Sequence, residues 1–107
     1  VIQGISGMED TVLIIMPEHG RNKQPNTLYD DKGLRAYDHT SDDNSREVFA
    51  MIAGGSGVVK QGQEVGDATT PVGESIDIVP TIASILGFKD DIPSGMLPGR
   101  HLTEAFV

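Results

Sequence analysis

Residues 11–20 constrain this chain most, because they join a strand-like apolar run to two side chains that can bind metal. Residues 12–16 are unbroken in their apolar character, which is typical of a strand buried on both faces of a sheet. Pro17 ends the run, and Glu18 and His19 follow at once. Ligands of α/β sheets usually bind beyond the carboxyl ends of the strands. The sequence therefore favours a functional role for Glu18 and His19, with solvated loop residues as the alternative.

A second apolar segment, residues 47–53, predicts another strand, and we expect residues 12–16 and 48–52 to be neighbours in one sheet. The Gly-rich run 54–57 ends this segment. It lacks the Lys-Ser or Lys-Thr ending of a phosphate-binding loop, so it predicts a plain turn. In residues 58–65 the pairs Val58-Val59 and Glu64-Val65 flank a polar turn, which predicts a short surface hairpin.

The strongest helix pattern covers residues 78–86. Apolar residues recur there at i, i+3, i+4 and i+7, so one face of the helix is apolar and is expected to pack on the sheet. Pro80 fits only the first turn, which makes Asp77 the expected N-cap. Gly87 is the expected residue just past the C-terminus. A short apolar turn at residues 102–106 is expected to close the chain.

Residues 21–46 are the least regular part, with repeated turn residues and no lasting helical pattern. A long irregular connection inside a compact domain is usually functional or disordered. His39 stands near its end, 20 residues after His19. Because the ends of this loop lead to two strands of the same sheet, we expect His39 to return to within ~10 Å of His19, the reach of ligands to two adjacent metals. For a lone His, the alternative to a ligand is a solvated or hydrogen-bonded side chain. His101 has no acidic neighbour before Glu104 and is expected on the surface.

Acidic residues outnumber basic residues by sixteen to eight, which gives a net charge of −8 in 107 residues. Nucleic acids and anionic membranes bind clustered Lys and Arg, so we expect no nucleic-acid partner and no membrane partner. No apolar run reaches the roughly 18 residues of a membrane-spanning helix. The chain has no Cys, which excludes disulfides and thiolate chemistry.

The short stretch before residue 11 shapes the expected fold class. A buried strand of the parallel type needs neighbouring strands and crossover connections, and this stretch is too short to provide one. We therefore expect an α/β fold that forms the last portion of a larger protein, with few strands and one main amphipathic helix. Residues 1–107 are expected to form a single partial domain.

The order of these pieces resembles the C-terminal part of the alkaline phosphatase superfamily, which includes sulfatases and cofactor-independent phosphoglycerate mutases. Residues 11–20 are similar to that family's strand running into Asp-His-Gly. His39-Thr40 is similar to the later His-Thr of the phosphatase and mutase branches. Residues 75–87 and 93–102 are similar to the sulfatase-type ending. The similarity covers nearly the whole chain and less than half of a family member, and it implies an alkaline phosphatase-like sheet and a periplasmic or extracellular location.

The resemblance also implies a metal site. In the two-metal members the Asp-His pair serves one metal and the His of His-Thr serves the other, and the matching positions here are Glu18, His19 and His39. These side chains suit a divalent cation, zinc first, with manganese or calcium as alternatives. Glu18 departs from the family's Asp by one methylene group, which changes the reach of its carboxylate. The family's nucleophile and its remaining ligands lie upstream, and nothing before residue 11 matches them.

Three functions fit these observations. The first is the C-terminal part of a metal-dependent hydrolase of phosphate or sulfate esters, which contributes part of the metal site, lacks the nucleophile and is inactive as an isolated chain. The second is a non-catalytic metal-binding or self-associating interaction module that uses the same three side chains. The third is an unrelated α/β domain in which they are incidental. Open sheet edges and apolar faces predict that the isolated chain is a homo-oligomer.

Overall fold

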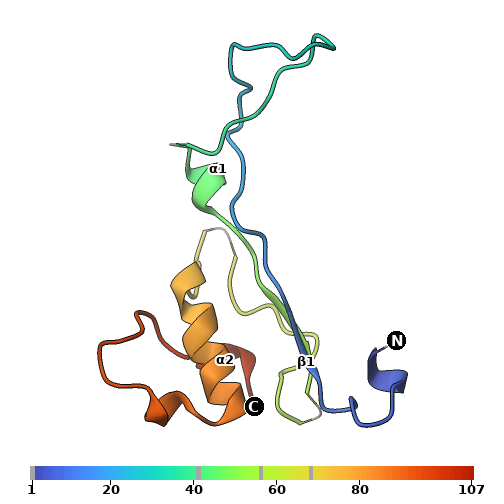
Figure 1. Cartoon of the computed structure of the whole chain (residues 1–107), viewed down its shortest axis with the longest axis vertical. Coiled ribbons are helices and arrows are strands. Elements are labelled where there is room, and N and C mark those ends of the chain that lie inside the picture. Colours follow the sequence, from blue (N-terminus) through green and yellow to red (C-terminus); the bar gives the residue numbers. More distant parts are fainter. Residues whose placement is uncertain (1, 41, 56, 68) are drawn as a thin grey trace. The chain divides into compact units, whose positions relative to one another are not determined.

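The computed structural model describes residues 2–40, 42–55, 57–67 and 69–107. The chain divides into two compact units, which we call the helical unit (Val1–Val12 and Ala53–Val107) and the loop unit (Leu13–Ile52). The single partial domain over residues 1–107 stays a prediction. The elements, in chain order and as labelled where there is room in Figure 1, are η1 (Ile2–Gly4), β1 (Val12–Ile15), α1 (Asp43–Arg46), β2 (Met51–Gly54), η2 (Ser75–Asp77), α2 (Ile78–Leu86), η3 (Lys89–Asp91) and η4 (Thr103–Ala105).

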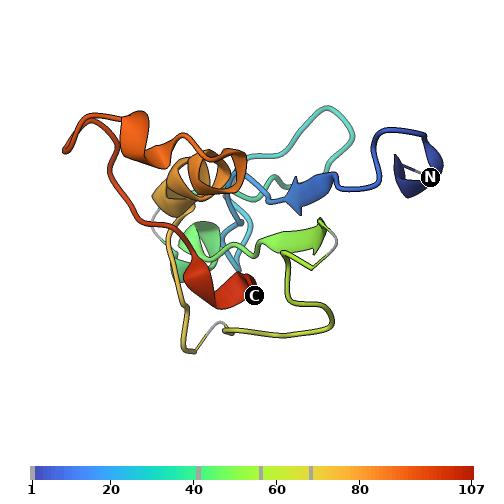
Figure 2. The same cartoon turned by 90° about the horizontal axis from the view of Figure 1, so that it is seen from below.

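β1 and β2 form a two-stranded antiparallel sheet, and Figure 2 shows them side by side. The prediction that the two apolar segments are neighbouring strands of one sheet is confirmed. The chain has mixed α/β content. The prediction that residues 12–16 are buried on both faces is wrong, because Leu13 and Ile15 remain 43% and 46% exposed. An apolar run records residue type, but burial of its second face also requires a covering layer. β1 instead alternates between half-buried and exposed side chains.

The Gly-rich run after β2 is a turn, as predicted. Gly54 and Gly55 have φ values of 85° and 58°, which side chains with a Cβ rarely adopt. The N–H of Gly55 donates to the carbonyl oxygen of Thr11 at 3.0 Å. Ser56 lies outside the described residues.

α2 has the predicted bounds, and Gly87 ends it in the left-handed conformation with a φ of 83°. The N-terminal side differs from the prediction, because the 3₁₀ turn η2 runs directly into the helix. The Asp77 side chain makes no capping hydrogen bond to α2. It accepts instead from the backbone N–H of Glu74 at 2.8 Å, so it fixes the turn that leads into the helix.

The helical unit has a small apolar core that joins α2 to the C-terminal segment. Val59 and Phe106 form an antiparallel bridge, so the surface hairpin predicted for residues 58–65 is wrong. The expected turn before Phe106 is present as η4, and it brings that side chain inward. Pairing with Phe106 buries Val59, which a surface hairpin would not do. The buried apolar side chains among the described residues include Val59, Ala83, Leu102 and Phe106, together with Pro80 of α2.

The largest part of the loop unit is a segment that folds back on itself, residues 22–40, which we call the hairpin loop (Figure 1). The sequence predicted only repeated turns here. The turn at its tip uses Gly33 with a φ of 75°, and an isolated bridge joins Tyr29 to Arg35. Three backbone hydrogen bonds cross the loop, from the N–H groups of Asn22, Asn26 and Asp30 to the carbonyl oxygens of Asp38, Ala36 and Leu34, at 2.7, 2.8 and 2.8 Å.

Candidate metal centre

Gly20 fixes the backbone directly after His19. A Cβ at this position would overlap the carbonyl oxygen of Asn44, so a larger residue would force the two segments apart. The N–H of Gly20 donates to the carbonyl oxygen of Ser45, in α1, at 2.9 Å. Ser45 is buried, with only 4% of its surface exposed. The segment that carries His19 is therefore held against α1 by close backbone contact.

The imidazole rings of His19 and His39 stack on each other. Their centroids lie 4.0 Å apart and their planes differ by 15°. His19 is half-buried and His39 is exposed. The two residues are far apart in sequence, and the hairpin loop returns one to the other. The closeness that we expected from the sequence is present, and the metal-binding role of the two rings stays a prediction.

A hydrogen bond of His19 determines which of its ring nitrogens is free. Nδ1 lies 2.6 Å from the carbonyl oxygen of Gly20. Because a carbonyl oxygen only accepts, Nδ1 carries the proton, and in the neutral ring Nε2 then holds a free lone pair. Metal-binding imidazoles usually donate their other N–H to a carbonyl or carboxylate in this way. His19 therefore has the arrangement of a ligand that binds through Nε2.

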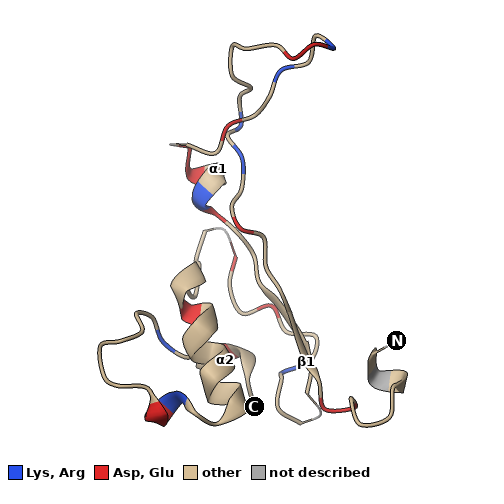
Figure 3. Ribbon diagram, in the orientation of Figure 1, with Lys and Arg blue, Asp and Glu red and all other residues tan. Residues whose placement is uncertain are grey.

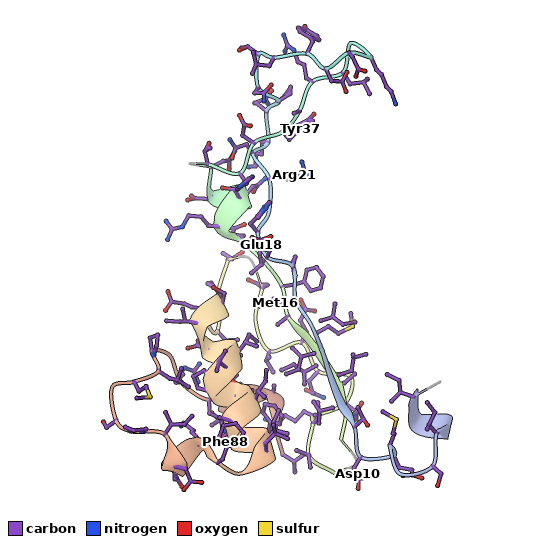
Figure 4. The ribbon with its side chains drawn as sticks, in the orientation of Figure 1. Asp10, Met16, Glu18, Arg21, Tyr37 and Phe88 are labelled. Carbon is purple, nitrogen blue, oxygen red and sulfur yellow. The ribbon has the colours of Figure 1, made fainter. Side chains whose placement is uncertain are left out.

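Glu18 is exposed and lies between Met16 and Arg21 on the segment that leaves β1 (Figure 4). In residues 2–40, 42–55, 57–67 and 69–107, no group of three or more His, Cys, Asp or Glu side chains is placed to hold a metal ion. The loop unit thus presents a pair of imidazoles. A ligand role for Glu18 stays a prediction.

Asp42 is the carboxylate that ties the base of the hairpin loop to α1. It accepts from the backbone N–H of Lys23 at 3.0 Å and from that of Asn44 at 2.9 Å. The N–H of Lys23, followed by that of Asn44, holds the pKa of Asp42 below its usual value, and the charge of Lys23 acts in the same direction. Figure 3 shows that Lys, Arg, Asp and Glu all occur along this unit. Each carboxylate oxygen of Asp42 thus accepts one backbone N–H, and the two bonds fix the side chain between the hairpin loop and α1.

A second polar cluster lies in the helical unit around Asp77, for which the sequence predicts only a helix cap. Asp77 is 5% exposed, and Arg100 donates its backbone N–H to Asp77 at 2.9 Å. The N–H of Glu74 chiefly, helped by the N–H and charge of Arg100, holds the pKa of Asp77 below its usual value against the opposing effect of burial. Thr81, fully buried, accepts from the N–H of Leu102 at 3.0 Å. These groups satisfy one another and join α2 to the C-terminal segment.

An open cavity of about 510 Å³ lies beside this cluster. Its one cationic side chain, Arg100, makes two hydrogen bonds to Glu104, at 2.9 and 3.1 Å. It makes two more to the carbonyl oxygens of Val72 and His101, at 2.6 and 3.1 Å. The guanidinium is therefore occupied by the protein itself. We assign this cavity no ligand.

His101 is half-buried, so its expected place on the surface is wrong. Its ring packs on that of Phe106 with the centroids 5.1 Å apart. Its Nε2 atom is buried and has no hydrogen-bond partner within the described part of the chain. The turn η4 brings Phe106 back over His101, a contact that the local sequence does not reveal.

No protein-family model, curated protein or solved structure matches the chain. Among the described residues, no helix is both long enough and apolar enough to cross a membrane.

Proposed function

We propose that this chain is the C-terminal part of a metal-dependent hydrolase of phosphate or sulfate esters, related to the alkaline phosphatase superfamily. In this proposal Glu18, His19 and His39 contribute part of a divalent metal site, and the nucleophile comes from another part of the enzyme. One observation carries the proposal: His19 and His39, which match two ligand positions of that family, stack with their ring centroids 4.0 Å apart.

The donor set fits divalent metal chemistry. Imidazole nitrogen together with a carboxylate suits zinc, and ligand sets richer in oxygen suit manganese or calcium. The ring separation of 4.0 Å is close to the metal–metal separation of about 3.5–4 Å in two-metal sites. A separation of this size is compatible with each ring binding one of two neighbouring cations, as we propose. When bound, such cations polarise the ester oxygens and stabilise the leaving oxygen.

The charge of the chain is consistent with a metal-dependent site. A net charge of −8 disfavours binding of a free anion. Bound cations reverse the local field and allow a phosphate or sulfate ester to approach. The proposed substrates therefore depend on the metal rather than on Lys or Arg side chains.

Calorimetric titration of the 107-residue chain with Zn²⁺ and Mn²⁺ tests the metal site. We expect weak binding that His19→Ala and His39→Ala each abolish. His101→Ala is the control, because His101 belongs to the other unit. If all three variants bind as the wild type does, the metal proposal is wrong.

The enzyme class requires a separate test. Extending the gene upstream should reveal an Asp followed by a Ser or Thr nucleophile, and the longer protein should hydrolyse a chromogenic phosphate or sulfate ester. Loss of that activity in His19→Ala would show that His19 acts in the same site as the upstream nucleophile. A longer protein without such a nucleophile would leave only the metal-binding function.

A self-associating interaction module is the second candidate, and exposed apolar side chains favour it. Leu13, Ile15, Phe49 and Met51, in and next to the two strands, are 43–60% exposed. Homo-oligomerisation would cover such surface. Light scattering at increasing concentration measures this directly, and a monomer at all concentrations contradicts it.

A further inference from the structure

The side chain of Asn22 makes two hydrogen bonds to Thr40 at the base of the hairpin loop, one to its hydroxyl group and one to its backbone. Nδ2 of Asn22 donates to Oγ1 of Thr40 at 3.1 Å, and the N–H of Thr40 donates to Oδ1 of Asn22 at 3.3 Å. The backbone N–H of Asn22 also donates to the carbonyl oxygen of Asp38 at 2.7 Å. Asn22 therefore binds both residues that flank His39.

The ring of His19 is held in place by contacts that do not involve Asn22. His19 is oriented by its own hydrogen bond to Gly20, whose N–H in turn binds Ser45. His39 is exposed, so packing against the rest of the unit contributes little to its position. The place of its ring thus depends on the backbone at residues 38 and 40, which Asn22 holds.

We propose that Asn22 and Thr40 are positioning residues that hold the His39 ring against the His19 ring. This inference rests on the proposed function for its chemical purpose, since the pair would place two metal ligands. The ring contact itself does not depend on metal. Figure 4 shows that Arg21 and Tyr37 come from the two sides of the same loop base, where a guanidinium nitrogen of Arg21 donates to the Tyr37 carbonyl oxygen at 3.3 Å.

Stabilisation of the hairpin loop as a whole is the alternative role for this contact, and Asp30 at the loop tip provides the matched control. Its side chain also makes two hydrogen bonds, accepting from the N–H groups of Lys32 and Leu34 at 2.9 and 2.8 Å. Asp30→Ala removes as many bonds as Asn22→Ala removes from the Asn22 side chain, but none of them touches the residues beside His39.

The test is NMR on the metal-free, 107-residue chain with isotope-labelled histidines, measuring the nuclear Overhauser effect between the His19 and His39 ring protons. We expect a clear signal in the wild type, in Asp30→Ala and in Thr40→Ser, which keeps the hydroxyl group. We expect it to fall several-fold in Asn22→Ala and Thr40→Ala. Unchanged amide shifts of the helical unit, such as that of Leu102, show that a variant is folded.

Zinc titration of the same variants supplies the second measurement. Loss of a residue that orients a metal ligand typically weakens binding about 10–100-fold, and we expect this for Asn22→Ala and Thr40→Ala but not for Asp30→Ala or Thr40→Ser. If the wild type binds no zinc, the proposed function fails, while the ring signal still decides the positioning role. That role is overturned if the wild type lacks the ring signal, if both alanine variants keep it, if Thr40→Ser loses it, or if Asp30→Ala loses as much.

Discussion

The helical unit and the loop unit are each stabilised internally by a different kind of interaction. The helical unit buries a group of apolar side chains, including Leu102 and Phe106, around a satisfied polar cluster. In the loop unit the buried residue among those described is Ser45, and its contacts are mainly hydrogen bonds across the hairpin loop and to α1. Apolar burial stabilises without directional demands, whereas each of these hydrogen bonds requires its own geometry.

This difference bears on the candidate metal centre. A hydrogen bond contributes only about 0.5–1.5 kcal/mol net, so a unit built from them opens locally at low free-energy cost. The His19–His39 pair lies in that unit. Metal binding by this pair, as proposed, would therefore supply stability that the core of the unit does not.

The largest expected effect is a difference in stability loss between two Leu→Ala substitutions, one in each unit. Leu102→Ala removes a side chain that is 9% exposed and should destabilise the helical unit by about 2–5 kcal/mol. Leu34→Ala removes one that is 62% exposed in the hairpin loop and should change stability by no more than about 0.5 kcal/mol. Urea denaturation measures both. Equal losses would contradict the account of a core confined to the helical unit.

Asp77→Asn tests the polar cluster of the helical unit. The amide cannot accept from both backbone N–H groups with the strength of a carboxylate, and we expect a loss of about 1–3 kcal/mol. Because the folded-state pKa of Asp77 lies below its ordinary value of 3.8, the unfolded chain binds the proton more readily. The contribution of Asp77 is therefore present above about pH 4 and is lost as the pH falls through the folded-state pKa.

The control for this prediction is the acid arm of the stability curve. Asp77→Asn should flatten the loss of stability below about pH 4 and lower stability at neutral pH. A variant whose acid unfolding matches that of the wild type would show that Asp77 does not carry this dependence.

The smallest effect is expected at the surface ion pair of Arg100 and Glu104. Both side chains are well exposed, 47% and 40%, so solvent and salt screen their attraction. Glu104→Gln should shift the Tm only slightly, and the shift should shrink further as salt is added. A large shift that persists at high salt would show that the C-terminal segment depends on this pair rather than on Leu102 and Phe106.

The sequence predicted those elements that have a local periodic signal. The apolar face and Gly87 define α2 within one segment, and the two apolar runs identify the strand regions. The approach of His39 to His19 also followed, because both ends of the intervening loop lead to paired strands.

The features that the sequence did not reveal depend on long-range or single contacts. The bridge from Val59 to Phe106 joins residues that no local pattern connects, and the burial of His101 follows from the same chain reversal. The path of the hairpin loop depends on individual bonds, such as those of Asn22, which leave no periodic trace. The sequence contains only Asn22 and, further along the chain, His39-Thr40. Such residues are too common to identify the Asn22–Thr40 contact by themselves.

Hydrogen–deuterium exchange with and without Zn²⁺ tests the central claim, that His19 and His39 form part of a metal site in the weaker unit. At a zinc concentration of 100 times Kd, binding stabilises the folded state by about 2.7 kcal/mol. Amide exchange that requires release of the metal should therefore become about 100-fold slower. We predict this slowing in the hairpin loop, none in α2, and none anywhere in His19→Ala. Equal exchange of the loop with and without zinc, or slowing that persists in His19→Ala, would contradict the account.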